Sequence, residues 1–225
     1  MPRIRHIGGI GSILTAKGEK RGEGPNFVGV TLAVGAATSA MSLAMPSGWQ
    51  PEDILIGAIV GSGGGTFQYV PPGWAGLGQF TISGGGGIAL FCKRAKAGDT
   101  TISVAVSSTE SRLGILAAYR PRGPIDLQFD QLPVPILNKA GAGGPINIAS
   151  SLATRASRMI VVTGSGNYGA ATVTPTPTGL TERGTTTSGT SRIYLFDGPV
   201  RKGEDMARSV TWTGGDHIST AAFLL

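Results

Sequence analysis

The stretch DILIG at residues 53–57 and the stretch MIVVT at residues 159–163 decide the fold class of this 225-residue chain. Each is a short apolar run that follows a polar, turn-like segment, and both are rich in β-branched residues, which favour strands. Ile54 and Ile160 stand 106 residues apart. A run of this kind in each half of the chain predicts two equivalent buried strands.

Three further pairs of landmarks keep nearly the same separation. A glycine in a proline-containing turn recurs after 106 residues, as Gly73 and Gly179. A glycine before an acidic residue recurs after 105 residues, as Gly98 and Gly203, and an aromatic residue near the end of each half recurs after 104, as Tyr119 and Phe223. Because the register holds within two residues over a hundred, the sequence predicts two tandemly duplicated halves.

The composition indicates many short strands and turns. The chain contains 37 glycines and 14 prolines, and only 14% of its residues are charged. Residues 102–106 alternate large apolar side chains with small ones, as a strand with one solvated face does. We therefore predict an all-β protein, an antiparallel β-sandwich of the jelly-roll or immunoglobulin type, built from the two halves.

The same landmarks divide the chain into four parts. We predict a first β half-domain over residues 28–120 and a second over 145–225, with a Pro/Gly-rich linker or edge strand over 121–144. The proline-rich corner at residues 71–73 cannot lie in a central strand. Trp74 follows that corner, and we expect its ring to be buried inside the sandwich.

Residues 1–27 predict an extended, basic N-terminal arm. The overall net charge is +6, and residues 1–24 carry five basic against two acidic side chains. Isolated apolar residues lie between glycines without helical or strand periodicity. The segment is either a flexible terminus or a strap that orders on a neighbouring subunit. In the second case the residues that bind the neighbouring subunit are the basic and apolar ones: Arg3, Arg5, Ile7, Ile10, Ile13, Lys17, Lys20 and Arg21.

The sequence contains no recognisable catalytic or metal-binding pattern, so we expect neither an enzyme nor a cofactor. Cys92 is the single cysteine and lies in an apolar run, which is typical of a buried, inert thiol. Two distant histidines and one cysteine are too few for a zinc site. The glycine clusters match no phosphate-binding motif. We also expect no membrane span and no specific nucleic-acid binding.

One aromatic residue favours a different kind of site. Trp49 lies in the turn sequence PSGWQP, between two prolines, where its ring is a candidate contact for a glycan. Together with the positive net charge, this gives an alternative function. The chain would be a tail-associated adhesin or carbohydrate-binding module that recognises an anionic host surface.

The motifs of the first half resemble a family of two-lobed, glycine-rich β-sandwich proteins among the virion structural proteins of tailed phages. The resemblance rests on four segments and covers about residues 30–225: DILI at 53–56, PPGW at 71–74, AGDT at 97–100 and AAYR at 117–120. The second half departs from the pattern, with Leu180 in place of the tryptophan and Phe223 in place of the tyrosine.

This resemblance implies a place on a bacteriophage particle. The leading expectation is a non-enzymatic decoration or cement subunit, or a head-fibre subunit, bound through its N-terminal arm. Its partners would be other capsid or tail proteins and further copies of itself, for example in a trimer. It would be made in the bacterial host cytoplasm and end in the virion. The family supplies no site residues that transfer to this chain.

Overall fold

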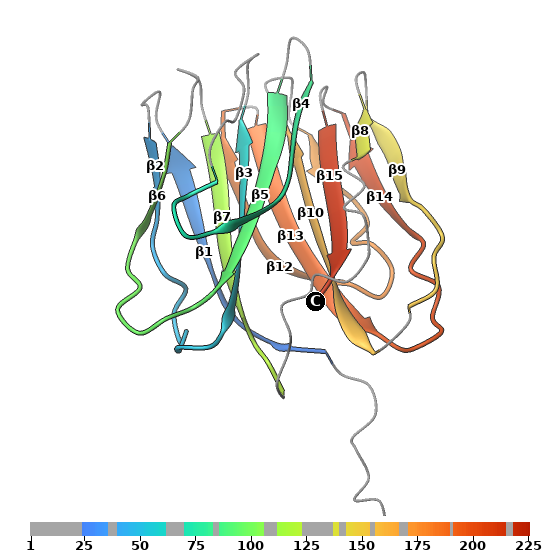
Figure 1. Cartoon of the computed structure of the whole chain (residues 1–225). Coiled ribbons are helices and arrows are strands. Elements are labelled where there is room, and N and C mark those ends of the chain that lie inside the picture. The colour runs from blue at the N-terminus through green and yellow to red at the C-terminus, as the bar shows by residue number, and fades with distance from the viewer. Residues whose placement is uncertain are drawn as a thin grey trace, which may run out of the picture.

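The structure is a computed structural model, and it describes residues 24–35, 40–61, 70–82, 86–105, 112–122, 137–139, 143–153, 156–166, 171–189, 191–214 and 218–225. Within these ranges the chain forms fifteen β-strands and no helix (Figure 1). Every strand pairing is antiparallel. The prediction of an all-β antiparallel sandwich is therefore confirmed.

The first lobe contains strands β1 to β7. These are β1 (Asn26–Gly35), β2 (Ala40–Leu43), β3 (Ile54–Gly61), β4 (Ala75–Ile82), β5 (Gly86–Arg94), β6 (Ile102–Ala105) and β7 (Arg112–Arg120). Five of them form a large sheet in the order β1-β7-β3-β5-β4, and β2 pairs with β6 in a small sheet. The first strand pairs with the last, the second with the sixth and the third with the fifth. This nested pairing is that of a jelly roll, not of an immunoglobulin sandwich.

The second lobe contains strands β8 to β15. These are β8 (Leu137–Lys139), β9 (Gly144–Ile148), β10 (Ser157–Ser165), β11 (Thr172–Val173), β12 (Thr181–Ser188), β13 (Ser191–Val200), β14 (Arg208–Thr213) and β15 (Ile218–Leu224). Its large sheet has the order β12-β13-β10-β15-β8, and its small sheet the order β11-β14-β9. Apart from β11, each strand has a counterpart in the first lobe with the same neighbours.

The strand registers follow the spacing of the sequence landmarks, with one exception. Ile54 lies opposite Tyr119, and Ile160 lies opposite Phe223. A bulge interrupts β4 between Gly76 and Gly78, and β12 has its bulge 106 residues later. The exception is the pairing of β10 with β13, which is displaced by two residues relative to that of β3 with β5. A two-residue shift leaves each side chain on its predicted face.

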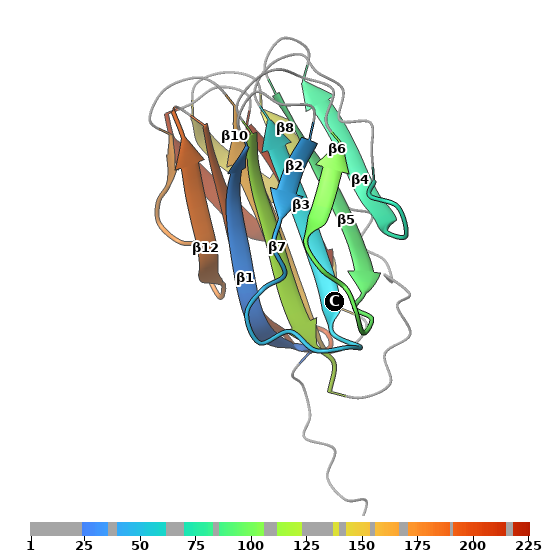
Figure 2. The ribbon, with the colours of Figure 1, turned by 90° about the vertical axis from the view of Figure 1, so that its left-hand side faces the viewer.

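The two large sheets pack face to face, and this central core unites the lobes. Side chains from alternate positions of β3 and β7 meet side chains from β10 and β15: Ile54, Ile56 and Tyr119 on one side, and Ile160, Val162 and Phe223 on the other. The intervening positions point outward and are covered by the small sheets. Figure 2 shows β2 and β6 lying over the outer face of the first large sheet. The molecule is thus a stack of four β-layers.

The central strands are mostly apolar because both of their faces are buried. Every residue of β3 and of β10 is buried, whereas β2 and β6 alternate buried and exposed residues. Leu55 and Ile59 of β3 pack with Met41 and Leu43 of β2 in the outer core of the first lobe. The runs that the sequence marks as buried strands are therefore the inner strands of the stack.

The packing between the lobes has an approximate two-fold arrangement. Strand β7 packs against β13. The counterparts of these two strands in the other lobe, β15 and β5, also pack against each other. Strand β3 crosses its own counterpart β10, and a Cβ placed at Gly164 would lie 2.5 Å from Cγ2 of Val60. Such a self-complementary contact is that of a symmetric dimer. The lobes therefore pack as two subunits of a dimer would, within one chain.

Candidate functional site

The residues that lead into β1 cross from the second lobe to the first at the end of the sandwich where β1 begins (Figure 1). A Cβ placed at Gly24 would lie 2.4 Å from the backbone nitrogen of Arg158 and 2.5 Å from the carbonyl carbon of Ser157. A side chain does not fit at this position. Gly24 is therefore in close contact with the start of β10, and the chain passes over the seam between the lobes.

Three arginines contact the next three residues. Arg158 Nε donates a hydrogen bond of 2.6 Å to the carbonyl oxygen of Pro25. The guanidinium of Arg122 donates to Asn26 Oδ1 at 2.5 and 3.1 Å. The guanidinium of Arg183 lies over the ring of Phe27, 4.7 Å from its centroid. Residues 24–27 are thus held by side chains from both lobes.

A buried carboxylate joins two of these arginines. Asp197 on β13 is fully buried, and its Oδ1 accepts hydrogen bonds of 2.8 Å from Arg158 and 2.8 Å from Arg183. We call Arg122, Arg158, Arg183 and Asp197 the arginine clasp. Because a buried charge is costly unless it is paired and hydrogen-bonded, the carboxylate and the two guanidiniums depend on one another. Asp197, Arg158 and Arg183 therefore form one cooperative unit within the clasp.

Two aromatic residues complete the clasp on the side of the first lobe. The rings of Phe27 and Tyr119 pack edge to face with 5.7 Å between their centroids. The Tyr119 side chain is buried, and burial together with the negative charge of Asp197 raises the pKa of its hydroxyl well above the usual value. The phenol therefore stays neutral and contributes a rigid apolar wall.

The sequence-predicted arm falls on residues that the structure does not describe. Arg3, Arg5, Ile7, Ile10, Ile13, Lys17, Lys20 and Arg21 all lie outside the described residues. What the structure adds is the root of that segment, residues 24–27, and the clasp that holds it. The predicted boundary at residue 28 is close to the observed start of β1 at Asn26. Residues 137–139 of the predicted linker form β8 at the edge of the second large sheet.

The two tryptophans singled out in the sequence both pack against the outer core of the first lobe. Trp49 is half-buried there, so only part of its ring faces solvent, and its role as a glycan contact stays a prediction. Trp74 is half-buried as well, which corrects the expectation of a fully buried ring. Its edge-to-face contact with Phe91, at 5.2 Å between centroids, places it over the sheet instead of within it.

Sequence reasoning missed the arginine clasp, although one signal was present. Arg158 is the second residue of the buried strand β10, and Asp197 follows Phe196 within the apolar run of β13. Charged residues are seldom fully buried without a partner, so their place in such runs indicates an ion pair. The sequence did not show which charges meet, because Arg158 and Asp197 stand 39 residues apart in the chain.

The described residues offer little for catalysis. Cys92 is buried, and burial raises the pKa of its thiol to about 12, so the interpretation of an inert thiol is consistent with the structure. The described part of the chain holds no group of three or more histidine, cysteine or acidic side chains arranged for a metal ion. None of the described residues forms a helix long and apolar enough to cross a membrane.

Comparison with known proteins gives no relative for this chain. No protein family, no curated protein and no solved structure matches it.

Proposed function

We propose that this chain is a non-enzymatic structural subunit of a phage particle, a decoration, cement or head-fibre subunit that attaches through its N-terminal segment. The observation that carries the proposal is the arginine clasp, which fixes residues 24–27 where a basic segment of 23 residues joins the β-stack. The sequence motifs of the first half support the same assignment.

The clasp gives the N-terminal segment a defined starting point. A segment that begins at a fixed position pays less entropy when it binds a neighbouring subunit than one that begins at a mobile position. The positive charge of this segment favours a partner with an acidic surface. The four-layer stack supplies the rigid body that such a segment would fasten to a particle.

The proposal is tested on the particle itself. Virions are purified from the strain that encodes this chain, and the copy number of the chain is measured against that of the major capsid protein by quantitative mass spectrometry. We expect a fixed ratio that persists through gradient purification. Absence of the chain from purified particles would overturn the proposal.

A second experiment tests the route of attachment. A variant without residues 1–21, which keeps the clasp and its four root residues, is added to particles that lack the chain. We expect its occupancy to fall at least tenfold relative to the full chain, because the basic and apolar contacts of the segment are lost. A control with Lys96 and Lys202 replaced by glutamine removes two positive charges from exposed turns of the stack and keeps full occupancy. Equal binding of the truncated and full chains would place the contact elsewhere.

The number of copies that act together is a separate proposal. We propose a homo-oligomer, for example a trimer, which light scattering on the purified full chain measures directly. A monomer at all accessible concentrations would contradict it.

A further inference from the structure

Two corners of the molecule have the same backbone but different side chains. In the first lobe the turn at residues 71–74 closes with a hydrogen bond of 3.0 Å from Trp74 N to Pro71 O. In the second lobe the turn at residues 177–180 closes with one of 3.1 Å from Leu180 N to Pro177 O. Both turns contain a glycine in the left-handed region, with φ of 79° at Gly73 and 75° at Gly179.

A second turn stands beside each of these corners, and it too is the same in both lobes. Asp99 N donates to Lys96 O at 3.1 Å while its carboxylate accepts from Lys96 N at 2.8 Å. Glu204 repeats both bonds with Arg201, at 3.0 and 2.9 Å. The two corners are therefore matched templates, and any difference between them lies in their side chains.

The corner of the second lobe is closed by direct packing. A Cβ placed at Gly198 would lie 2.2 Å from the carbonyl oxygen of Gly179 and 3.0 Å from Cδ2 of Leu180. The turn thus rests on the backbone of β13, and Leu180 is buried in the outer core. Glu204 is paired with Arg208 at 2.9 Å.

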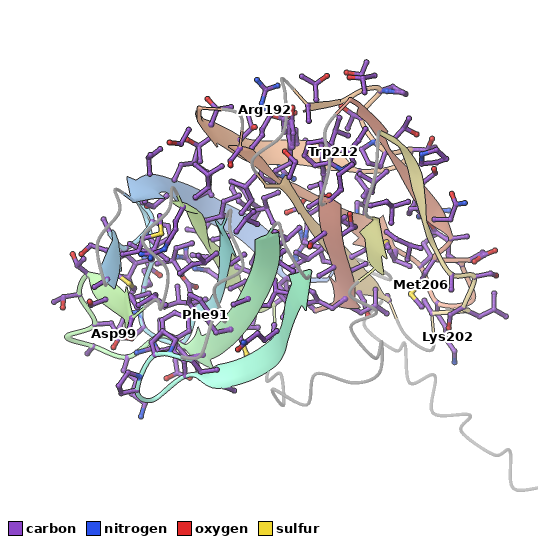
Figure 3. The ribbon with its side chains drawn as sticks, turned by 90° about the horizontal axis from the view of Figure 1, so that it is seen from above. Phe91, Asp99, Arg192, Lys202, Met206 and Trp212 are labelled. Atoms are coloured by element: carbon purple, nitrogen blue, oxygen red, sulfur yellow. The ribbon has the colours of Figure 1, made fainter. Side chains whose placement is uncertain are left out.

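The corner of the first lobe is open. Lys93 stands at the position equivalent to Gly198, and Trp74 stands at that of Leu180. Between the two turns lies a cavity of about 250 Å³. Its lining residues come from the proline-rich turn, from β5 and from the turn that leads into β6: Pro71, Pro72, Trp74, Lys93, Asp99 and Thr101, with their neighbours. Figure 3 shows Asp99 and Lys202, which mark the second turns of the two lobes, on opposite sides of the molecule.

The polar groups of this cavity are charged but balanced. Lys93 Nζ lies 2.6 Å from Asp99 Oδ1 and 5.3 Å from the centroid of the Trp74 ring. The ammonium supplies donors, the carboxylate supplies acceptors, and Thr100, Thr101 and Ser103 bring hydroxyls that do both. The net charge of the Lys93–Asp99 pair is zero. Lys96 acts on Asp99 from the same turn but does not line the cavity, and the mixture of donors and acceptors that does line it suits a ligand with many hydroxyls.

We propose that this cavity binds a neutral saccharide, with Trp74, Lys93 and Asp99 as contact residues. The charged pair and the hydroxyls offer hydrogen bonds to the hydroxyls of a sugar, and the part of the Trp74 ring that Lys93 and Phe91 leave uncovered offers an apolar edge to its C–H groups. The volume is slightly below the range of about 300–1,000 Å³ usual for drug-sized ligands, which suits one sugar residue of a glycan. This site does not depend on the N-terminal segment or on the particle.

Binding is tested by saturation-transfer NMR on the full chain with methyl glycosides of glucose, galactose and N-acetylglucosamine at millimolar concentration. We expect at least one of them to receive saturation. In Trp74→Leu, which introduces the residue of the second lobe, the affinity falls at least about tenfold, as for loss of an aromatic anchor. The control is Lys202→Gln, which changes an exposed residue in the equivalent turn of the second lobe and leaves binding unchanged.

A measurement on the unmodified chain covers the case in which Trp74→Leu fails to fold. The three indole N–H resonances are followed in a proton–nitrogen spectrum while the sugar is added. We expect the Trp74 signal to shift while those of Trp49 and the buried Trp212 stay. Absence of saturation for every glycoside, equal binding by Trp74→Leu and Lys202→Gln, or a shift confined to Trp49 would each overturn the proposal.

Discussion

The two lobes share their strand order and their corner turns, and they differ in where each places its charged side chains. Cys92 lies opposite Ala75 in the first lobe, and at the equivalent position of the second lobe Asp197 lies opposite Thr181. The first lobe instead keeps an ion pair, Lys93 with Asp99, at an open corner. At this equivalent position one template thus buries a carboxylate in one copy and a small thiol in the other.

This difference teaches where to look for function in a chain with two similar halves. Features present in both halves, such as the left-handed glycines and the strand bulges, maintain the fold. Features present in one half, such as the arginine clasp and the Trp74 corner, have no structural counterpart to account for them. The following predictions test that division, beginning with the largest expected effect.

The largest effect is expected at the buried charge of the second lobe. Replacement of Asp197 by alanine leaves the guanidiniums of Arg158 and Arg183 without their shared carboxylate, which costs about 3–5 kcal/mol of unfolding free energy. The matched change in the first lobe, Cys92→Ala, removes only a small apolar group and costs about 1 kcal/mol. Urea unfolding of both variants measures the difference. Equal stabilities would show that Asp197, Arg158 and Arg183 are not a cooperative unit.

A smaller effect is expected where the two lobes cross. Gly164→Ala places a Cβ against Val60, and overpacking of this kind costs about 1–3 kcal/mol. Val60→Ala makes room for that Cβ, so the double variant is more stable than the sum of the single changes predicts. A double-mutant cycle by urea unfolding gives the coupling energy. Additive effects would mean that β3 and β10 are not in contact at this point.

A similar cost in both lobes is expected at the glycines of the second turns. Gly98 and Gly203 have φ of 88° and 80°, and no atom lies within 4 Å of a Cβ at either position. Alanine at either site is therefore destabilising through backbone strain alone, by about 1 kcal/mol. Thermal unfolding compares the two variants. A cost more than twice as large in one lobe would contradict the equivalence of the turns.

The smallest effect is expected from the pH dependence of the same turns. Burial acts to raise the pKa of Asp99, but hydrogen bonds from Lys93 and Lys96 and their charges lower it on balance, and a hydrogen bond from the Arg201 amide lowers the pKa of Glu204. Because both folded pKa values are depressed, these carboxylates stabilise the fold above their unfolded pKa, near 4, and lose that contribution as the pH falls.

Amide variants isolate this contribution. Asp99→Asn and Glu204→Gln each flatten the loss of stability between neutral pH and pH 3, and the effect shrinks at high salt because both side chains are partly exposed. Urea unfolding over that pH range measures it. An unchanged pH profile in both variants would show that the carboxylates contribute nothing.

Much of the fold followed from local sequence pattern, and little of the candidate site did. The apolar runs at residues 53–57 and 159–163 predicted inner strands because a strand buried on both faces needs apolar side chains at every position. The glycines at 98 and 203 are typical of turns because glycine readily adopts a positive φ, and both have one in the structure. The arginine clasp joins residues from four strands or strand ends, and no local pattern links them.

The sequence by itself indicated an all-β protein with many turns and a repeat of landmarks in two halves, because these depend on neighbours along the chain. Only the tertiary structure decided that the halves share a central core, that residues 24–27 cross the seam under three arginines, and that one of two matched corners is open. Those features depend on which faces meet in space. The absence of a side chain at Gly198, against the long side chain of Lys93, then sets whether a turn rests on the sheet or stands away from it.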